Sequence, residues 1–178
     1  YLYEAGRRIR GGVMFLLDSN VFIDAKNRYY SFDVVPGFWE WLDQAFLGSV
    51  LCSIDAVREE LLAGSDELSD WARTRKAFFR EIDQPTVRHF AVLSEWARGQ
   101  NYQQAALDEF ATDRADFLLI AFARQYHFTV VTLEKSNSRK RNRVMIPDAC
   151  KAMGVPVCDP FQMLAESMVR LDLRSQAT

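Results

Sequence analysis

Two patterns of apolar residues alternate along the chain. Short apolar runs rich in β-branched residues are typical of buried strands, whereas apolar residues that recur every three or four positions are typical of helices. This alternation predicts an α/β fold in which helices cover both faces of a central, mostly parallel sheet. The predicted strands are 13–17, 49–54, 128–132 and 155–158, and the predicted helices are 37–46, 55–64, 67–82, 87–99, 113–126 and 159–171.

The length and the uniform pattern predict one domain. A chain of 178 residues is long enough for one well-buried core, and it contains no internal repeat and no linker rich in Gly or Ser. The first strand-like segment opens at Met14, so we expect a single domain over 14–172 and a C-terminal tail over 173–178. Residues 1–13 are either an extension that the fold does not need or a genuine N-terminal arm.

Composition indicates a cytoplasmic protein. No apolar run approaches the roughly 20 residues of a membrane span. Three arginines before 13–17 imitate a secretory signal, but Asp18 ends the apolar run too early for one. The three cysteines lack CxxC spacing, which favours reduced thiols, and two isolated histidines give little support to a zinc hydrolase or a histidine-based triad.

One aspartate stands inside an apolar stretch, VMFLLDSNVFI, residues 13–23. A buried carboxylate without a partner costs several kcal/mol. Asp18 directly follows a predicted strand, and ligands of parallel sheets bind beyond the carboxyl ends of the strands, so Asp18 can face that crevice. Two other interpretations remain open: Asp18 caps a helix that begins near Val21, or DSN forms a turn.

Further acids interrupt apolar surroundings. Glu59 and Glu60 are about 100° apart on a helix, and we expect Glu60 to point inward and Glu59 to face solvent. Asp113 and Asp116 are three residues apart, hence on one helical face. Asp113 is alternatively an N-cap, and Asp116 a first-turn acid favoured by the helix dipole.

Glu134 follows the predicted strand 128–132, where it is either a site residue or a surface acid. Several carboxylates in one crevice repel one another, and a hard divalent ion, Mg²⁺ or Mn²⁺, relieves the repulsion. Such an ion lowers the pKa of bound water and polarises a phosphoryl oxygen. The acids therefore predict metal-assisted hydrolysis of a phosphodiester.

Four short motifs resemble those of PIN domains, the superfamily of metal-dependent nucleases that includes the VapC-like toxins. LLDSNVFI resembles the first motif, VREEL the second, RADFLLIAFA the third and VVTLE the fourth, with Glu134 where the family usually has aspartate. The segments AKNRYYSFDVVPGFWEWL (25–42) and VMIPDACKAMGVPV (144–157) are similar to a PIN-like branch described as a domain of unknown function.

The resemblance implies a PIN-like three-layer sandwich and a metal-dependent endoribonuclease, the toxin of a bacterial toxin–antitoxin pair. Its cofactor would be Mg²⁺ or Mn²⁺, and its partners RNA and an antitoxin protein. The residues implied are a catalytic metal cluster of Asp18, Glu60 and Asp116, assisted by Glu134 or Asp113, with Ser19, Asn20 and Thr132 orienting the ligands.

A basic segment, KSNSRKRNR (135–143), follows the fourth motif and contains no acid. Beside an acidic metal pocket it would hold an RNA backbone without reading its sequence; the alternative is a solvated loop. The helical segment 67–107 could supply a surface for a partner or a homodimer. The candidate RNA-binding residues are Lys135, Arg139, Lys140, Arg141 and Arg143.

Two competing functions remain. A phosphatase with an aspartate nucleophile would use Asp18, but such enzymes usually place a second aspartate where Asn20 stands. A PIN-like scaffold that binds RNA or a protein without catalysis is the other, and Glu134 in place of the usual aspartate supports it.

Overall fold

A computed structural model describes residues 14–111 and 114–172 and contains a five-stranded sheet in the order β3-β2-β1-β4-β5. Every neighbouring pair is parallel, as the alternating pattern predicted. Phe15 of the central strand lies opposite Leu51 on one side and Thr129 on the other. The strands are β1 (Phe15–Leu17), β2 (Leu51–Ile54), β3 (Phe79–Arg80), β4 (Thr129–Val131) and β5 (Val157–Cys158).

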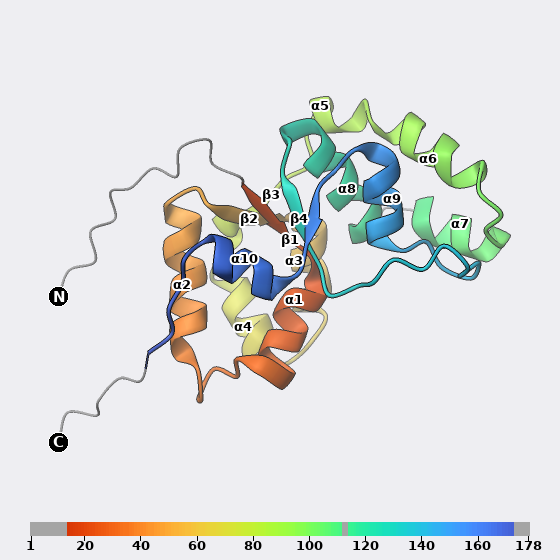
Figure 1. The fold of residues 1–178 in the computed structure, drawn as a ribbon. Helices are drawn as coiled ribbons and strands as arrows, with labels where there is room; N and C mark the ends of the chain where they lie inside the picture. Colours follow the sequence, from red (N-terminus) through yellow and green to blue (C-terminus); the bar gives the residue numbers. More distant parts are fainter. Residues whose placement is uncertain (1–13, 112–113, 173–178) are drawn as a thin grey trace, which may run out of the picture.

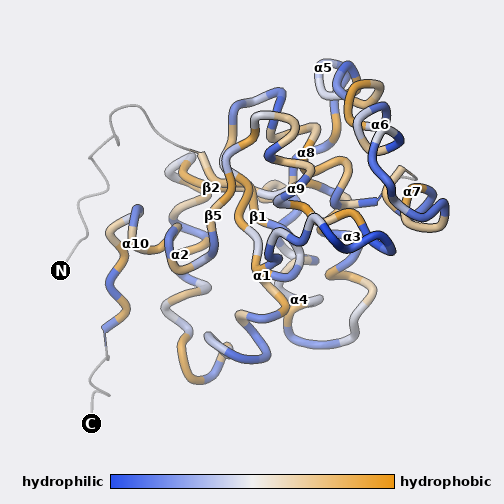
Figure 2. Tube along the Cα trace, turned by 45° about the vertical axis from the view of Figure 1, so that its right-hand side comes forward, coloured by the Kyte–Doolittle hydropathy of each residue, from blue (hydrophilic) through white to orange (hydrophobic). Residues whose placement is uncertain are grey.

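Helices cover both faces of the sheet and form the expected three-layer α/β sandwich. In Figure 1, α1, α2, α4 and α10 lie on one side of the strands and α5 to α9 on the other, while α3 packs against α1, α4 and α8. Figure 2 shows the apolar strands at the centre and polar segments on the periphery. The helices are α1 (Ser19–Asp24), α2 (Pro36–Leu47), α3 (Asp55–Leu62), α4 (Glu67–Arg73), α5 (Gln84–Val87), α6 (Phe90–Arg98), α7 (Gln104–Ala111), α8 (Ala115–Tyr126), α9 (Ile146–Met153) and α10 (Pro160–Glu166), with a π-helical turn at Ala25–Tyr29 and a 3₁₀ turn at Lys76–Phe78.

The strand order reverses direction beside β1. The chain runs from β1 to β2 and β3 on one side, then crosses to β4 and β5 on the other. In open parallel sheets the crevice at such a switch point, beyond the carboxyl ends of the strands, is where ligands bind. The segments after β1 and β4 therefore meet at this crevice.

Aromatic packing fixes the helix that follows β1. Phe22 of α1 is fully buried, with its ring centroid 5.6 Å from that of Trp71 on α4 and 6.0 Å from that of Phe78. Burying a phenylalanine contributes about 2–3 kcal/mol, so this contact holds α1 firmly against the neighbouring layer. The polar residues of the first turn of α1 are thereby held at the end of β1.

The predicted helix 67–82 is wrong in its second half. Helix α4 ends at Arg73, and the chain becomes extended at Phe79, which pairs with Ser53 of β2. Strand pairing with the sheet overrides the helical spacing of the apolar residues, as tertiary context often does. The predicted helix 87–99 is likewise divided, into α5 and α6, and α7 was not predicted as a separate element.

The last predicted helix, 159–171, is shorter than expected. Asp159 caps α10 by accepting from the backbone N–H of Gln162 at 2.9 Å, with Pro160 in the first turn, but the helix ends at Glu166. Met168 has a φ of 53°, in the left-handed region, which is incompatible with a continuing α-helix.

The predictions about 1–13, 173–178 and Asp113 fall outside the described residues, so the division of the chain into extension, domain and tail stays a prediction. All three cysteines are buried and unpaired. Among the described helices, none has both the length and the apolar character needed to cross a membrane.

Candidate metal centre

Asp18 lies at the carboxyl end of β1 and is only 1% exposed. It is the N-cap of α1, where its Oδ1 accepts from the backbone N–H of Ser19 at 2.7 Å. Its side chain also lines a cavity at the switch point. Asp18 is therefore both a helix cap and a residue of the crevice.

Hydrogen bonds accepted by Asp18 and Asn20 join the end of β1 to the end of β4. The Nδ2 of Asn20 and the Oγ1 of Thr132 donate to Asp18 Oδ2 at 2.5 and 2.8 Å. Asn20 Oδ1 in turn accepts from the backbone N–H of Leu133 at 3.0 Å. Asn20 and Thr132 thus hold the Asp18 carboxylate in place, and Ser19 does so through its backbone N–H and through its hydroxyl, which donates to Oδ1 at 3.4 Å.

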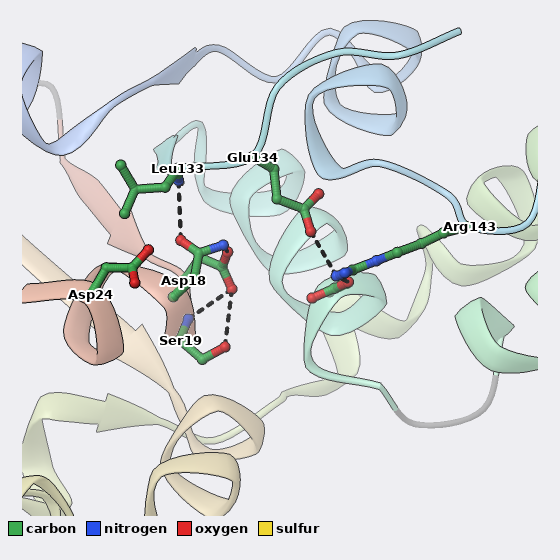
Figure 3. A pocket seen from close by; sticks show the side chains of 8 residues that line it. Asp18, Ser19, Asp24, Leu133, Glu134 and Arg143 are labelled. Carbon is green, nitrogen blue, oxygen red and sulfur yellow. Dashed lines mark hydrogen bonds and ion pairs between the residues drawn. The ribbon is translucent and has the colours of Figure 1, made fainter. Parts of the chain in front are cut away.

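Three of the predicted metal ligands lie around one cavity of about 290 Å³. Asp18 comes from the end of β1, Asp116 from the first turn of α8, and Glu134 from the segment after β4. Figure 3 shows Asp18, Glu134 and Arg143 around this space. We call it the acidic cavity; its lining is Asp18, Ser19, Asn20, Asp24, Asp116, Leu133, Glu134 and Arg143.

Arg143 lies between two of these acids. Its Nη2 is 2.6 Å from Glu134 Oε1 and 3.3 Å from Asp116 Oδ2. The other oxygen of Glu134 accepts from the backbone N–H of Ile146, at the start of α9, at 2.9 Å. Glu134, with its side chain 10% exposed, is therefore a cavity residue and not the surface acid of the alternative interpretation.

Glu60 lies outside the acidic cavity, and the expected inward orientation is wrong. Both Glu59 and Glu60 are exposed, because the buried face of α3 is formed by Val57 and Leu61. Glu60 does line a second cavity of about 180 Å³, which shares Ser19, Asp116 and Arg143 with the first. The two cavities are neighbours, so Glu60 lines the space next to the acidic cavity.

At the start of α8, the N-cap position belongs to Arg114, which makes no side-chain capping bond. The side chain of Asp113 lies outside the described residues. Asp116 does occupy the first turn, as predicted, where the helix dipole favours a negative charge.

Asp24 is a cavity residue that was not predicted. It ends α1, one turn after Asn20, and forms an ion pair with Arg28 at 3.3 Å. Positions four apart share a helical face, so the spacing from Asn20 to Asp24 was the available signal.

Hydrogen bonds attach the basic segment 135–143 to the rest of the protein near both of its ends. Asp148 of α9 accepts from the Ser136 hydroxyl and from the backbone N–H of Asn137, and the carbonyl of Arg141 accepts from the N–H of Gln103 at 2.8 Å. Lys135, Arg139 and Arg141 are exposed and Lys140 is half-buried, whereas Arg143, predicted to bind RNA, is engaged with acids.

The sequence matches a family model described as "Domain of unknown function (DUF4411)" over residues 15–171. The chain belongs to the DUF4411 family. No curated protein matches it.

Solved structures share the fold of this DUF4411 protein. FitAcB from Neisseria gonorrhoeae is 20% identical with a TM-score of 0.50, covering 83% of this chain and 99% of its own. FitAB bound to the IR36 DNA fragment is 18% identical with a TM-score of 0.50, covering 83% and 96%. VapBC2 from Rickettsia felis, bound to a DNA fragment from their promoter, is 12% identical with a TM-score of 0.52, covering 83% and 98%. The chain therefore shares a PIN-like fold with these structures, as the resemblance of its motifs implied.

The acidic cavity of the DUF4411 chain disfavours negative charge. Burial, together with the charge of Asp116, raises the pKa of Asp18 from 3.8 to about 7, although the hydrogen bond from Thr132 opposes the shift. Burial also raises the pKa of Asp116 and of Glu134; Arg143 opposes both shifts, and the N–H of Ile146 opposes the second. A bound cation would stabilise all three carboxylates in their charged forms.

The donor set fits a hard divalent cation, because it consists of carboxylate oxygens without histidine or thiolate. Within residues 14–111 and 114–172, however, no three His, Cys, Asp or Glu side chains stand close enough together to hold a metal ion as they are arranged. The Arg143 guanidinium separates Asp116 from Glu134. Coordination by all three acids therefore requires Arg143 to turn away.

Replacing Asp18 by asparagine should change how stability depends on pH in the metal-free protein. The folded-state pKa of Asp18 lies above its unfolded value, so its contribution to stability is full below about pH 4 and is lost as pH rises through about 7. In EDTA, Asp18→Asn should gain up to about 4 kcal/mol relative to wild type between pH 4 and pH 8, measured by urea unfolding.

Asp159→Asn is the control, because it makes the same change at the N-cap of α10, outside the cavity. A constant difference between Asp18→Asn and wild type across this pH range would contradict the buried, charge-disfavouring cavity.

Proposed function

We propose that this DUF4411 protein is a Mg²⁺- or Mn²⁺-dependent endoribonuclease that hydrolyses RNA phosphodiesters. The observation that carries the proposal is the acidic cavity, where Asp18, Asp116 and Glu134 meet at the switch point of the sheet. Such charge concentration in a buried position is characteristic of functional sites, because folding alone does not require it.

In this proposal Asp18, Asp116 and Glu134 hold the metal ion, with Asp113 assisting through water and Glu60 completing the cluster from the neighbouring cavity. The bound ion would supply an activated water nucleophile and neutralise charge on the phosphoryl group. Asn20 and Thr132 keep the carboxylate of Asp18 directed into the cavity through their bonds to Oδ2. Asp24, on the same wall, is a further candidate to bind a water of the ion.

The basic segment is proposed to bind the RNA backbone. Its exposed cations follow Glu134 directly, and its hydrogen bonds to Asp148 and Gln103 hold it next to the cavity. Cations that contact phosphates do not distinguish the bases, so RNA binding should be strong at low salt and should not depend on the RNA sequence. The proposed contacts are Lys135, Arg139, Lys140 and Arg141, with Arg143 available once it leaves the acids.

The toxin role and the antitoxin partner are proposed from the fold. Two of the similar structures, FitAB and VapBC2, are assemblies bound to DNA, the latter to a fragment of their promoter. By analogy, this chain would be a cytoplasmic toxin held by an antitoxin protein, and the segment 67–107 offers a surface for that partner or for a homodimer.

A non-catalytic scaffold is the second candidate. Arg143 already neutralises Asp116 and Glu134, and Glu134 stands where the family usually has aspartate, which would suit a protein that binds without a metal. The phosphatase alternative is weaker, because the Asn20 amide is committed to Asp18 and to the N–H of Leu133 and cannot act as an acid.

Cleavage of a mixed single-stranded RNA pool tests the proposal. Purified protein should cut with Mn²⁺ or Mg²⁺ but not with EDTA, and Asp116→Asn should lower the rate by about 100-fold or more, as expected for a metal ligand. Glu59→Gln is the matched control, since Glu59 is an exposed acid on α3 that lines neither cavity.

Circular dichroism should show that each variant is folded. Cutting that persists in EDTA or in Asp116→Asn would contradict the proposal, and binding of RNA without any cutting would favour the scaffold.

The salt dependence of RNA binding tests the basic segment. Replacing Arg139, Lys140 and Arg141 by alanine should reduce the slope of log affinity against log salt by about 2, because each lost phosphate contact on a single strand removes about 0.7. Fluorescence anisotropy with a labelled RNA at several salt concentrations gives the slope.

The control replaces three basic residues elsewhere, Lys76, Arg88 and Arg98, all of them exposed. An equal reduction in both triple variants would mean that net charge, and not the position of the segment, attracts RNA.

A further inference from the structure

Arg143 is the cation of the acidic cavity in this structure. A single nitrogen, Nη2, contacts both Glu134 Oε1, at 2.6 Å, and Asp116 Oδ2, at 3.3 Å. These are two of the three carboxylates that the proposed function assigns to the metal ion. The guanidinium therefore occupies the position between the two acids that a shared divalent ion would need.

The ion pair with Glu134 is better protected than a surface pair. The Glu134 side chain is 10% exposed and its second oxygen is held by Ile146, so this carboxylate is fixed in its direction. Exposed ion pairs contribute little to stability, and partial burial strengthens them because the surrounding dielectric is lower. Displacing Arg143 thus has a measurable cost.

The structure leaves room for the Arg143 side chain to move away from Glu134 and Asp116. Its side chain is 47% exposed at the mouth of the site, and it lines the second cavity as well as the first. It ends the basic segment, in which Lys135, Arg139 and Arg141 are exposed and Lys140 is half-buried. A turn of the side chain would carry the guanidinium away from Glu134 without moving the backbone, which Ile146 and Val144 anchor in the core.

We propose that Arg143 is a tethered counter-ion that occupies the acidic cavity in the metal-free protein and that a divalent ion must displace it to bind. The inference rests on the proposed function. It implies that in the metal-free protein the positive charge of Arg143 balances the negative charges of Asp116 and Glu134. Metal binding then releases a guanidinium beside the basic segment, where phosphate oxygens are its natural partners. Metal binding and RNA binding become positively coupled through one side chain.

Titration of Mn²⁺ into the full chain by calorimetry tests the displacement. Arg143→Ala removes the competitor and should bind Mn²⁺ about tenfold more tightly than wild type, within the 5- to 150-fold range of typical coupling between two sites. Arg143→Lys keeps the charge but lacks the planar guanidinium group, so its affinity for Mn²⁺ should lie between those of wild type and Arg143→Ala. Arg141→Ala removes an exposed charge from the same segment and should bind Mn²⁺ as wild type does.

A second readout needs no metal. In EDTA, Arg143→Ala should lower the melting temperature more than Arg141→Ala does, because it leaves Asp116 and Glu134 without their cation, and saturating Mn²⁺ should remove that difference. This comparison of melting temperatures distinguishes a counter-ion of the cavity from a residue whose role is only to contact RNA.

The outcomes separate the inference from the function on which it rests. If Arg143→Ala binds Mn²⁺ no more tightly than wild type, or no more tightly than Arg141→Ala, the displacement is refuted; Mn²⁺-dependent cleavage by wild type would still uphold the nuclease. If Mn²⁺ binds to none of the variants, both the inference and the proposed metal centre fail.

Discussion

The burial of one carboxylate, Asp18, at the end of the central strand constrains everything around it. A charge in this position needs donors, and three residues supply them: Ser19 with its backbone N–H and its hydroxyl, Asn20 with its amide and Thr132 with its hydroxyl. Because Thr132 follows β4 and Asn20 also binds Leu133, the bonds that satisfy Asp18 also fasten β1 to β4. The candidate site and the centre of the sheet are therefore held by the same interactions.

Topology explains why acids from distant segments meet there. The sheet reverses its order beside β1, so the segments after β1 and β4 end at one crevice, and the start of α8 delivers Asp116 to it. Burial then raises the pKa of each carboxyl group, and the charge of Asp116 raises the pKa of Asp18 and of Glu134 further. Such an arrangement is unfavourable unless a cation is present, and the chain supplies one of its own in Arg143.

Much of this could be predicted from sequence, for reasons that are local. Asp18 breaks an apolar run directly after a strand, and Glu134 follows another, so the strand pattern and the rule of carboxyl ends indicated the crevice for both, although a helix cap or a turn remained open for Asp18 and a surface position for Glu134. The orientation of Glu60 was not predictable, because it depends on which face of α3 meets the core. Strand β3 was missed since its two residues become a strand only by pairing with β2. The role of Arg143 could be recognised only in the structure, because its partners, Glu134 and Asp116, are 9 and 27 residues away along the chain.

The central claim is that the acidic cavity binds one divalent ion, and a crystal structure with Mn²⁺ tests it most directly through the anomalous scattering of the metal. The account predicts a single peak within coordinating distance of Asp18, Asp116 and Glu134 oxygens, with the Arg143 guanidinium turned out of the cavity. A structure at saturating Mn²⁺ with no peak there, and with Arg143 still between Asp116 and Glu134, would contradict it.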